Sequence, residues 1–312
     1  MSQYKKQHYI PQCYLKSWCD ESTPKHQTPY VWQFSKNTRE SKKKSPQNIF
    51  FENDMYTIKN ADGSKNFTLE KGLSELETKF SKLRTEKLQN RIPINLEEHI
   101  LLCAFIAAMH SRTKAQLIHQ KTQWQKPLEI MESMMEQAAH STPEQIKNMS
   151  LFTSPSEHKN SFGYEEIKNV VDKPMQHLLS PMISVLTPHF LNLDIIIFET
   201  DSSPGFITSD NPCFWFDPEA YKRPPMFQNP GLMYETIEIH FPISPRQLLV
   251  FNRLGLKGCQ KISKQFVTEE NRKAVLHSHE YFIVNKNYKN DLWFYEATGP
   301  RDAWEKISKE EI

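Results

Sequence analysis

The sequence predicts an α+β fold, with short N-terminal strands, a helical middle and a mostly antiparallel C-terminal sheet. Short runs rich in β-branched and aromatic residues occur before residue 60 and again after residue 189. Between them, leucine and phenylalanine recur at spacings of three, four and five residues, which indicates amphipathic helices. We expect one domain over 1–312, divisible into strands at 1–60, a helical part at 67–187 and a sheet part at 189–296.

The first half of the chain divides into strands and two long helices. Strands are expected at 8–15 and 28–34 and around a turn within 48–58. A helix is predicted over 68–91, with Thr68 as its N-cap. The central core helix begins after Asn95, which forms a capping box with Glu98, and it continues to about Pro127. Ile100 and Phe105 both belong to its expected core face.

The second half begins with broken helices and ends in strands. A Met-rich amphipathic segment covers 128–140, a short helix restarts at Thr142, and 153–163 is expected to be a polar loop. The helix predicted over 164–186 contains Pro174 and Pro181, so it should be kinked or split. Another helix is expected at 268–277. The expected strands are 193–200, 205–209, 236–244, 246–252 and 280–285.

Composition narrows the classes of function. The 312 residues carry a formal net charge of +2, which is too small to indicate nucleic acid or a membrane surface by itself. The chain has no glycine-rich phosphate loop, and its five cysteines form no CxxC pair that would indicate a zinc site or a disulfide framework. The longest apolar run, 100–109, is too short to span a bilayer, and no signal peptide is recognised. We therefore expect a cytoplasmic protein without a membrane partner.

The stretch Phe206–Pro212 runs from three apolar or β-branched residues into a compact polar turn. Pro212 disfavours the α region at Asn211, and Ser209, Asp210 and Asn211 are turn formers. One interpretation is that Asp210 is presented at the mouth of a sheet, where ligand-handling residues gather. The alternative is that Asp210 only closes its own turn.

A second motif, HYIPQCYL, covers His8 to Leu15. If it is extended, as the residue before a proline favours, His8 and Gln12 point to the same side. Histidine can act as acid or base near neutral pH, and glutamine can orient a substrate oxygen. The alternative is a structural histidine that is bonded to the backbone.

These motifs occur together with an Arg-Thr pair that closes the apolar part of the core helix (Arg112 and Thr113) and with FPISP at 241–245. The combination resembles the uncharacterised family catalogued as domain of unknown function 4238, over about residues 6–285. The resemblance implies a single folding unit of bacterial type and no established activity.

Arg112 offers a further hypothesis, because His119 lies seven residues later and shares its face on a continuous helix. This spacing is similar to that in metal-independent ribonucleases of the HEPN type. Alternatively, Arg112 is simply paired with a carboxylate.

Glu70 and Glu77 are also seven residues apart and share one helical face. With Asp210 they could hold a divalent metal through oxygen ligands, and no other cofactor is indicated. Alternatively, the two glutamates form ion pairs on the surface or between helices.

The sequence therefore predicts a nuclease-like, phosphodiester-cleaving effector of a bacterial toxin or phage-defence system. Its partners would be nucleic acid, RNA rather than DNA, and a protein such as an antitoxin or sensor. The proposed catalytic residues are His8, Gln12, Arg112 and Asp210, and we expect Asp210 to bond to Arg112 or to the His8 imidazole. The proposed binding residues are Tyr14, Glu70, Glu77, Thr113, Ser209 and Asn211. The alternative function is a non-catalytic sensor or adaptor that binds a phosphorylated ligand or a protein.

Overall fold

The N-terminal motif turns from a strand into a helix. The computed structural model describes residues 5–24, 26–60, 62–145 and 163–296. Strand β1 (Lys6–His8) pairs antiparallel with β4 (Phe51–Asn53), and after Pro11 the chain forms helix α1 (Gln12–Leu15) and a 3₁₀ turn at Lys16–Trp18. The prediction of a strand over 8–15 was therefore wrong. The physical reason is that Ile10, Tyr14 and Trp18 recur at helical spacing and are fully buried.

The helical middle has more breaks than the pattern predicts. Helix α2 (Thr68–Leu83) continues into a wider π-helical turn at Arg84–Leu88. Its first N–H is accepted by the Asn66 side chain, so Thr68 is not the cap. Helix α3 (Leu96–Ser111) has the predicted capping box of Asn95 and Glu98, which is confirmed.

The predicted single core helix is in fact two helices. Helix α3 ends at Ser111, and helix α4 (Lys114–Ala139) starts again with Thr113 as its N-cap, whose hydroxyl accepts from the Gln116 N–H. Threonine offers the backbone this alternative bond, which favours a new helix start over continuation. Pro127 lies inside α4 rather than at its end.

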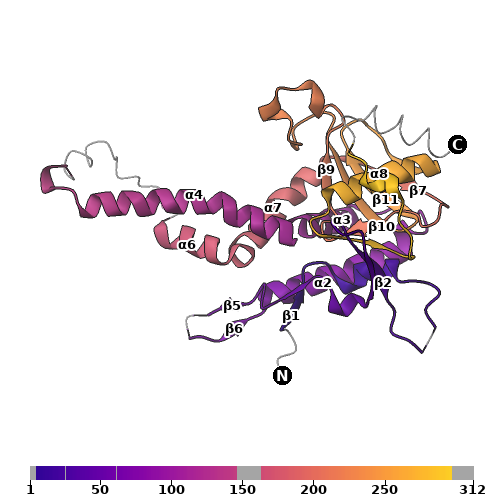
Figure 1. Ribbon diagram of the computed structural model, residues 1–312, viewed down its shortest axis with the longest axis horizontal. Coiled ribbons are helices and arrows are strands. Elements are labelled where there is room, and N and C mark those ends of the chain that lie inside the picture. Colours follow the sequence, from indigo (N-terminus) through magenta and orange to yellow (C-terminus); the bar gives the residue numbers. More distant parts are fainter. Residues whose placement is uncertain (1–4, 25, 61, 146–162, 297–312) are drawn as a thin grey trace.

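The split predicted at Pro174 is confirmed, because helix α6 (Tyr164–Asp172) ends before it and helix α7 (Pro174–Leu191) begins with it. Helix α6 lies beside α4 through Leu128, Ile167 and Val171, and the two project from the body as an arm (Figure 1). The loop expected at 153–163 lies outside the described residues except for Gly163.

Two sheets complete the α+β fold. The five-stranded sheet has the order β12-β7-β11-β10-β9, and the four-stranded sheet has the order β3-β2-β13-β8. In both sheets every pairing is antiparallel except that of β12 with β7. The five-stranded sheet consists of β7 (Asp194–Glu199), β9 (Phe214–Phe216), β10 (Glu238–Ser244), β11 (Gln247–Asn252) and β12 (Gly258–Lys261). The four-stranded sheet consists of β2 (Val31–Ser35), β3 (Ser41–Lys44), β8 (Thr208–Ser209) and β13 (Tyr281–Val284).

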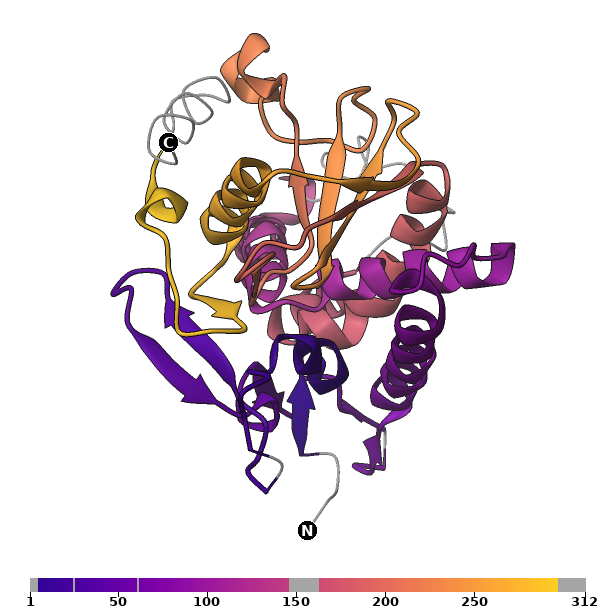
Figure 2. The ribbon, with the colours of Figure 1, turned by 90° about the vertical axis from the view of Figure 1, so that its right-hand side faces the viewer.

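The second sheet joins the two ends of the chain, since β2 from the N-terminal part pairs with β3 on one side and with β13 from the C-terminal part on the other. A separate small hairpin pairs β5 (Ile58–Lys59) with β6 (Lys65–Asn66). Helix α8 (Lys264–His277) lies beside the five-stranded sheet (Figure 2). It starts before the predicted Thr268 because the Ser263 side chain caps it.

The main core is organised around α3. The Phe105 ring is fully buried and stacks on the Phe80 ring of α2, with centroids 3.6 Å apart, while Phe241 of β10 meets both rings edge-on. Ile100, which the pattern placed in the core, is 41% exposed. Helix α3 thus links α2 to the five-stranded sheet through aromatic contacts.

We expect Phe105→Ala to lower the free energy of unfolding by about 3–5 kcal/mol, because it leaves a cavity between two aromatic rings. Urea denaturation monitored by circular dichroism measures this change. Ile100→Ala, on the exposed side of the same helix, is the control and should cost much less. A cost below about 1 kcal/mol for Phe105→Ala would contradict a central position for α3.

Candidate functional site

Arg112 lies at the break between α3 and α4, and its side chain is fully buried. Its Nη1 donates to Glu77 Oε1 of α2 at 2.7 Å, and its Nη2 lies 3.2 Å from the Met109 sulfur. Its Nε is buried and has no hydrogen-bond partner among the described residues. Because an unpaired donor on a buried cation is costly, this nitrogen is a candidate contact for an anionic ligand.

Tyr56 lies beside Arg112 and adds a second unused donor. The ring is fully buried, and its hydroxyl has no hydrogen-bond partner among the described residues. Its backbone N–H is held by the buried Gln7 side chain, whose amide also donates to Thr57 Oγ1 at 2.9 Å. Burial raises the pKa of Tyr56, so the phenol stays neutral and can donate a hydrogen bond near Arg112.

The two predicted glutamates of α2 belong to the same cluster. Burial raises the pKa of Glu70 to about 7, and the neighbouring Glu77 charge acts in the same direction, while Arg112 opposes the shift. Glu70 therefore exchanges a proton near neutral pH. Glu77, by contrast, is ion-paired with Arg112.

His8 is the fifth member. Its partly buried ring lies against Phe51, and Nε2 is 3.3 Å from the Gln47 carbonyl oxygen, so the Nε2–H donates and Nδ1 is left as the basic nitrogen. Burial lowers the pKa of His8; Gln47 and Glu77 oppose the shift and Arg112 supports it. The imidazole is therefore neutral at pH 7.

The cluster reaches the surface at Glu77, whose side chain is 25% exposed. Glu77 and Cys13 line a hollow of about 490 Å³, together with the small hydroxyl side chains of Ser74, Thr78 and Ser81. Burial raises the pKa of the Cys13 thiol to about 11, so it is not an activated nucleophile. His8, Tyr56, Glu70, Glu77 and Arg112 are called the Arg112 cluster below.

Asp210 does not pair with Arg112 or with His8, contrary to our expectation. Its carboxylate accepts three backbone N–H groups at 2.7–2.9 Å, from His279, Glu280 and Tyr281. Burial raises the pKa of Asp210, and these three donors oppose the shift. The carboxylate thereby holds the segment that enters β13, which is a structural role.

Gln12 does not share an extended face with His8, because α1 begins at Gln12. Tyr14 is fully buried, and its hydroxyl bonds to Thr208 Oγ1 at 2.7 Å and to the Pro242 carbonyl at 2.8 Å. The Asn211 amide donates to the His277 carbonyl at 2.9 Å.

Ser209 and Thr113, the other predicted binding residues outside the cluster, also form hydrogen bonds with backbone groups. Ser209 Oγ accepts the Asn211 N–H, and Thr113 caps α4. Arg112 and His119 lie on either side of the helix break, with Arg112 buried and His119 exposed, so the expected shared face is wrong.

Among the described residues, no group of three or more His, Cys, Asp or Glu side chains is arranged to hold a metal ion. No helix within the described ranges is long and apolar enough to cross a membrane.

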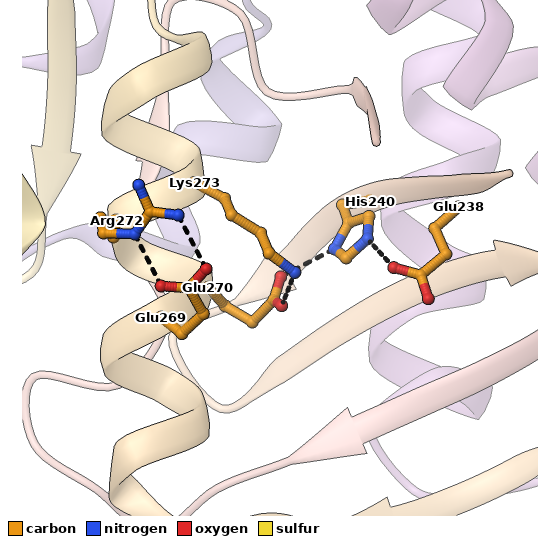
Figure 3. Close-up of polar contacts among 6 residues, drawn as sticks. All are labelled: Glu238, His240, Glu269, Glu270, Arg272 and Lys273. Carbon is orange, nitrogen blue, oxygen red and sulfur yellow. Dashed lines mark hydrogen bonds and ion pairs between the residues drawn. The ribbon is translucent and has the colours of Figure 1, made fainter. Parts of the chain in front are cut away.

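A network of buried charged side chains connects α8 with β10, and no sequence pattern predicted it (Figure 3). Glu270 Oε2 lies 2.7 Å from His240 Nδ1, and Glu270 Oε1 accepts from Lys273 at 2.8 Å. His240 Nε2 is also 2.9 Å from Glu238, and Glu269 pairs with Arg272. Burial alone would lower the pKa of His240, but the two glutamates raise it. Every charge in this network is paired, so we assign it to the structure of the α8–β10 contact.

The fold and the cluster define an α+β protein with a buried arginine site between α2 and α3. The family model described as "Protein of unknown function (DUF4238)" matches residues 6–288, so the chain belongs to that family. No curated protein and no solved structure matches the chain.

Tyr56 and Gln7 are the site residues that sequence reasoning missed. Tyr56 lies in a run of strand-like residues whose spacing does not mark any one of them as a site residue. Gln7 directly precedes the HYIPQ motif. Gln7 reaches Tyr56 because β1, which contains Gln7, pairs with β4, which ends shortly before Tyr56, and no local pattern fixes this pairing.

We expect Asp210→Ala to destabilise the fold by at least about 3 kcal/mol, because it leaves three backbone donors without their charged acceptor. Chemical denaturation measures this cost. Asp201→Ala removes an exposed aspartate from the same region and should leave the unfolding midpoint unchanged. An Asp210→Ala protein of full stability would show that the carboxylate is free for another role.

Proposed function

We propose that this protein cleaves phosphodiester bonds in RNA, as a nuclease-like effector of a bacterial toxin or phage-defence system. The observation that carries this proposal is the Arg112 cluster. It combines a buried cation that has a spare donor with a neutral imidazole that can accept a proton and a carboxyl group whose pKa is raised to about 7. Such a set provides charge stabilisation and general acid–base catalysis.

In the proposed reaction, a phosphate in the surface hollow replaces Glu77 on the Arg112 guanidinium. Arg112 and the Tyr56 hydroxyl then donate to the phosphate oxygens as negative charge develops. Neutral His8 removes the proton from the ribose 2′-hydroxyl, whose oxygen forms a bond to phosphorus. The bond from phosphorus to the 5′ oxygen breaks, and protonated Glu70 supplies the proton to that leaving oxygen. The substrate contributes the nucleophile, which favours RNA over DNA.

The first test is cleavage of total RNA by the purified protein. We expect His8→Ala and Glu70→Gln each to lower the cleavage rate at least about 100-fold, because each removes a proton-transfer group. His189→Ala changes an exposed histidine of α7 and should cleave at the wild-type rate. Expression of the wild-type protein should also arrest growth, whereas the two slow variants should not. Equal cleavage by folded wild-type and His8→Ala proteins would contradict the proposal.

The pH dependence gives a second test. Activity requires His8 to be neutral and Glu70 to be protonated, so it should rise through the lowered pKa of His8 and fall through the pKa of Glu70 at about 7. The rate should therefore be greatest on the acid side of pH 7. In Glu70→Gln, the residual activity should lose its fall above pH 7. A rate that keeps rising from pH 6 to pH 9 would be incompatible with these roles.

A non-catalytic sensor or adaptor is the second candidate. The buried Arg112 Nε and Tyr56 hydroxyl favour it, because neither has a hydrogen-bond partner in the part of the chain that the structure describes and both suit a phosphorylated ligand without any need for turnover. A mobility shift or raised melting temperature with phosphorylated ligands, without RNA cleavage, supports this alternative. Both proposals include a cytoplasmic location and a protein partner, such as an antitoxin, that restrains this protein.

A further inference from the structure

A cavity of about 620 Å³ lies on the other side of the α3 terminus from the Arg112 cluster. It is open to solvent on one side and is lined by the end of α3, by α4, α7 and β9, by the turn that carries Asn211, and by Pro230 and His277. No aspartate, glutamate, lysine or arginine is among the described residues that line it. Its volume is typical of sites for small organic ligands.

Aromatic rings form one wall of this cavity. Trp215 stacks on His110 with centroids 4.9 Å apart and an interplanar angle of 14°. Phe214 is buried between two imidazoles, His277 at 4.7 Å and His240 at 5.0 Å, so both faces of its ring are covered, and the Trp215–His110 pair supplies the flat aromatic surface. Met182 and Leu186 of α7 line the cavity as well. Flat aromatic and aliphatic surfaces of this kind suit a planar ring.

The two imidazoles that stack on the aromatic rings, His110 and His277, are neutral. His110 Nδ1 donates to the Cys213 carbonyl at 3.3 Å, and its Nε2 accepts from the Gln116 amide at 3.2 Å, which fixes the tautomer. Burial lowers the pKa values of His110 and His277 to about 4, and His119 also lowers that of His110. For His277 the further contributions come from four cationic groups behind it. These are His240, Lys36, Lys273 and Arg272.

One donor in this wall is unused, because the Trp215 indole Nε1 is buried without a hydrogen-bond partner among the described residues. Asn211, Gln116 and Gln120 add amide groups, each of which carries both a donor and an acceptor. The Asn211 and Gln116 amides already donate, to the His277 carbonyl and to His110, and each also carries a carbonyl oxygen that can accept. A lipid tail would offer no partner to these oxygens or to the indole N–H, and a charged ligand would find no Asp, Glu, Lys or Arg among the described lining residues.

We propose that this cavity binds an uncharged planar heteroaromatic ring that carries hydrogen-bonding edges, namely a nucleobase. The base can belong to a free nucleoside or to a nucleotide of RNA, and the same stacking and amide contacts serve both. The proposal does not depend on RNA cleavage, because a nucleoside contains no phosphodiester bond.

Titration calorimetry with adenosine, guanosine, cytidine and uridine tests the proposal on the full-length protein. We expect at least one nucleoside to bind with a dissociation constant on the order of 1 mM or tighter. Val185 is 58% exposed at the cavity, so Val185→Trp should fold and obstruct it, weakening binding at least about 10-fold. His189→Ala on the same helix is the control and should bind like the wild type. Melting curves verify that each variant is folded.

A short oligoribonucleotide is the second arm. If it binds more tightly than its nucleoside and Val185→Trp weakens both, the base belongs to RNA; equal binding indicates a free nucleoside. His8→Ala should bind nucleosides like the wild type, which separates this result from loss of cleavage. Absence of binding by all four nucleosides, or binding that Val185→Trp leaves unchanged, would overturn the proposal.

Discussion

The ion pair between Arg112 and Glu77 is the constraint on which the site depends. A guanidinium without any exposed surface must be paired, since the free-energy cost of desolvating an isolated charge is too large for the fold to offset. Glu77 is held on α2, which packs against α3 through Phe80 and Phe105, so the core contact and the ion pair fix the same helix pair. Glu70 on the same helical face is harder to ionise, first because it is partly buried and then because the Glu77 charge lies nearby, and Arg112 opposes both effects.

The break between α3 and α4 places two different environments within three residues. Arg112 faces Glu77, whereas His110 bonds to Cys213 and Gln116 on the side of β9. The Arg112 cluster and the open pocket therefore share the end of one helix. A displacement of this terminus would affect both.

Local patterns sufficed for the coarse arrangement of N-terminal strands, helical middle and C-terminal sheet and for the Asn95 cap, because these depend on neighbouring residues, whereas helix α1 and the strands β9 and β12 were missed. The break at Thr113 was missed because the apolar run and the residues after it are both good helix formers, and only the Thr113 cap separates them. Of the predicted site residues, the structure brings together His8, Glu70, Glu77 and Arg112. Asp210 looked like a presented carboxylate, yet its three partners are backbone groups about 70 residues away in sequence, and no local pattern identifies them.

The central claim is that Glu70 titrates near neutral pH inside the Arg112 cluster. An NMR titration of ¹³C-labelled glutamate carboxyls tests it most directly, with the Glu70 signal assigned by its loss in Glu70→Gln. The account predicts a midpoint at about 7, raised by burial and by Glu77. A midpoint at the ordinary glutamate value of 4.5 would contradict it.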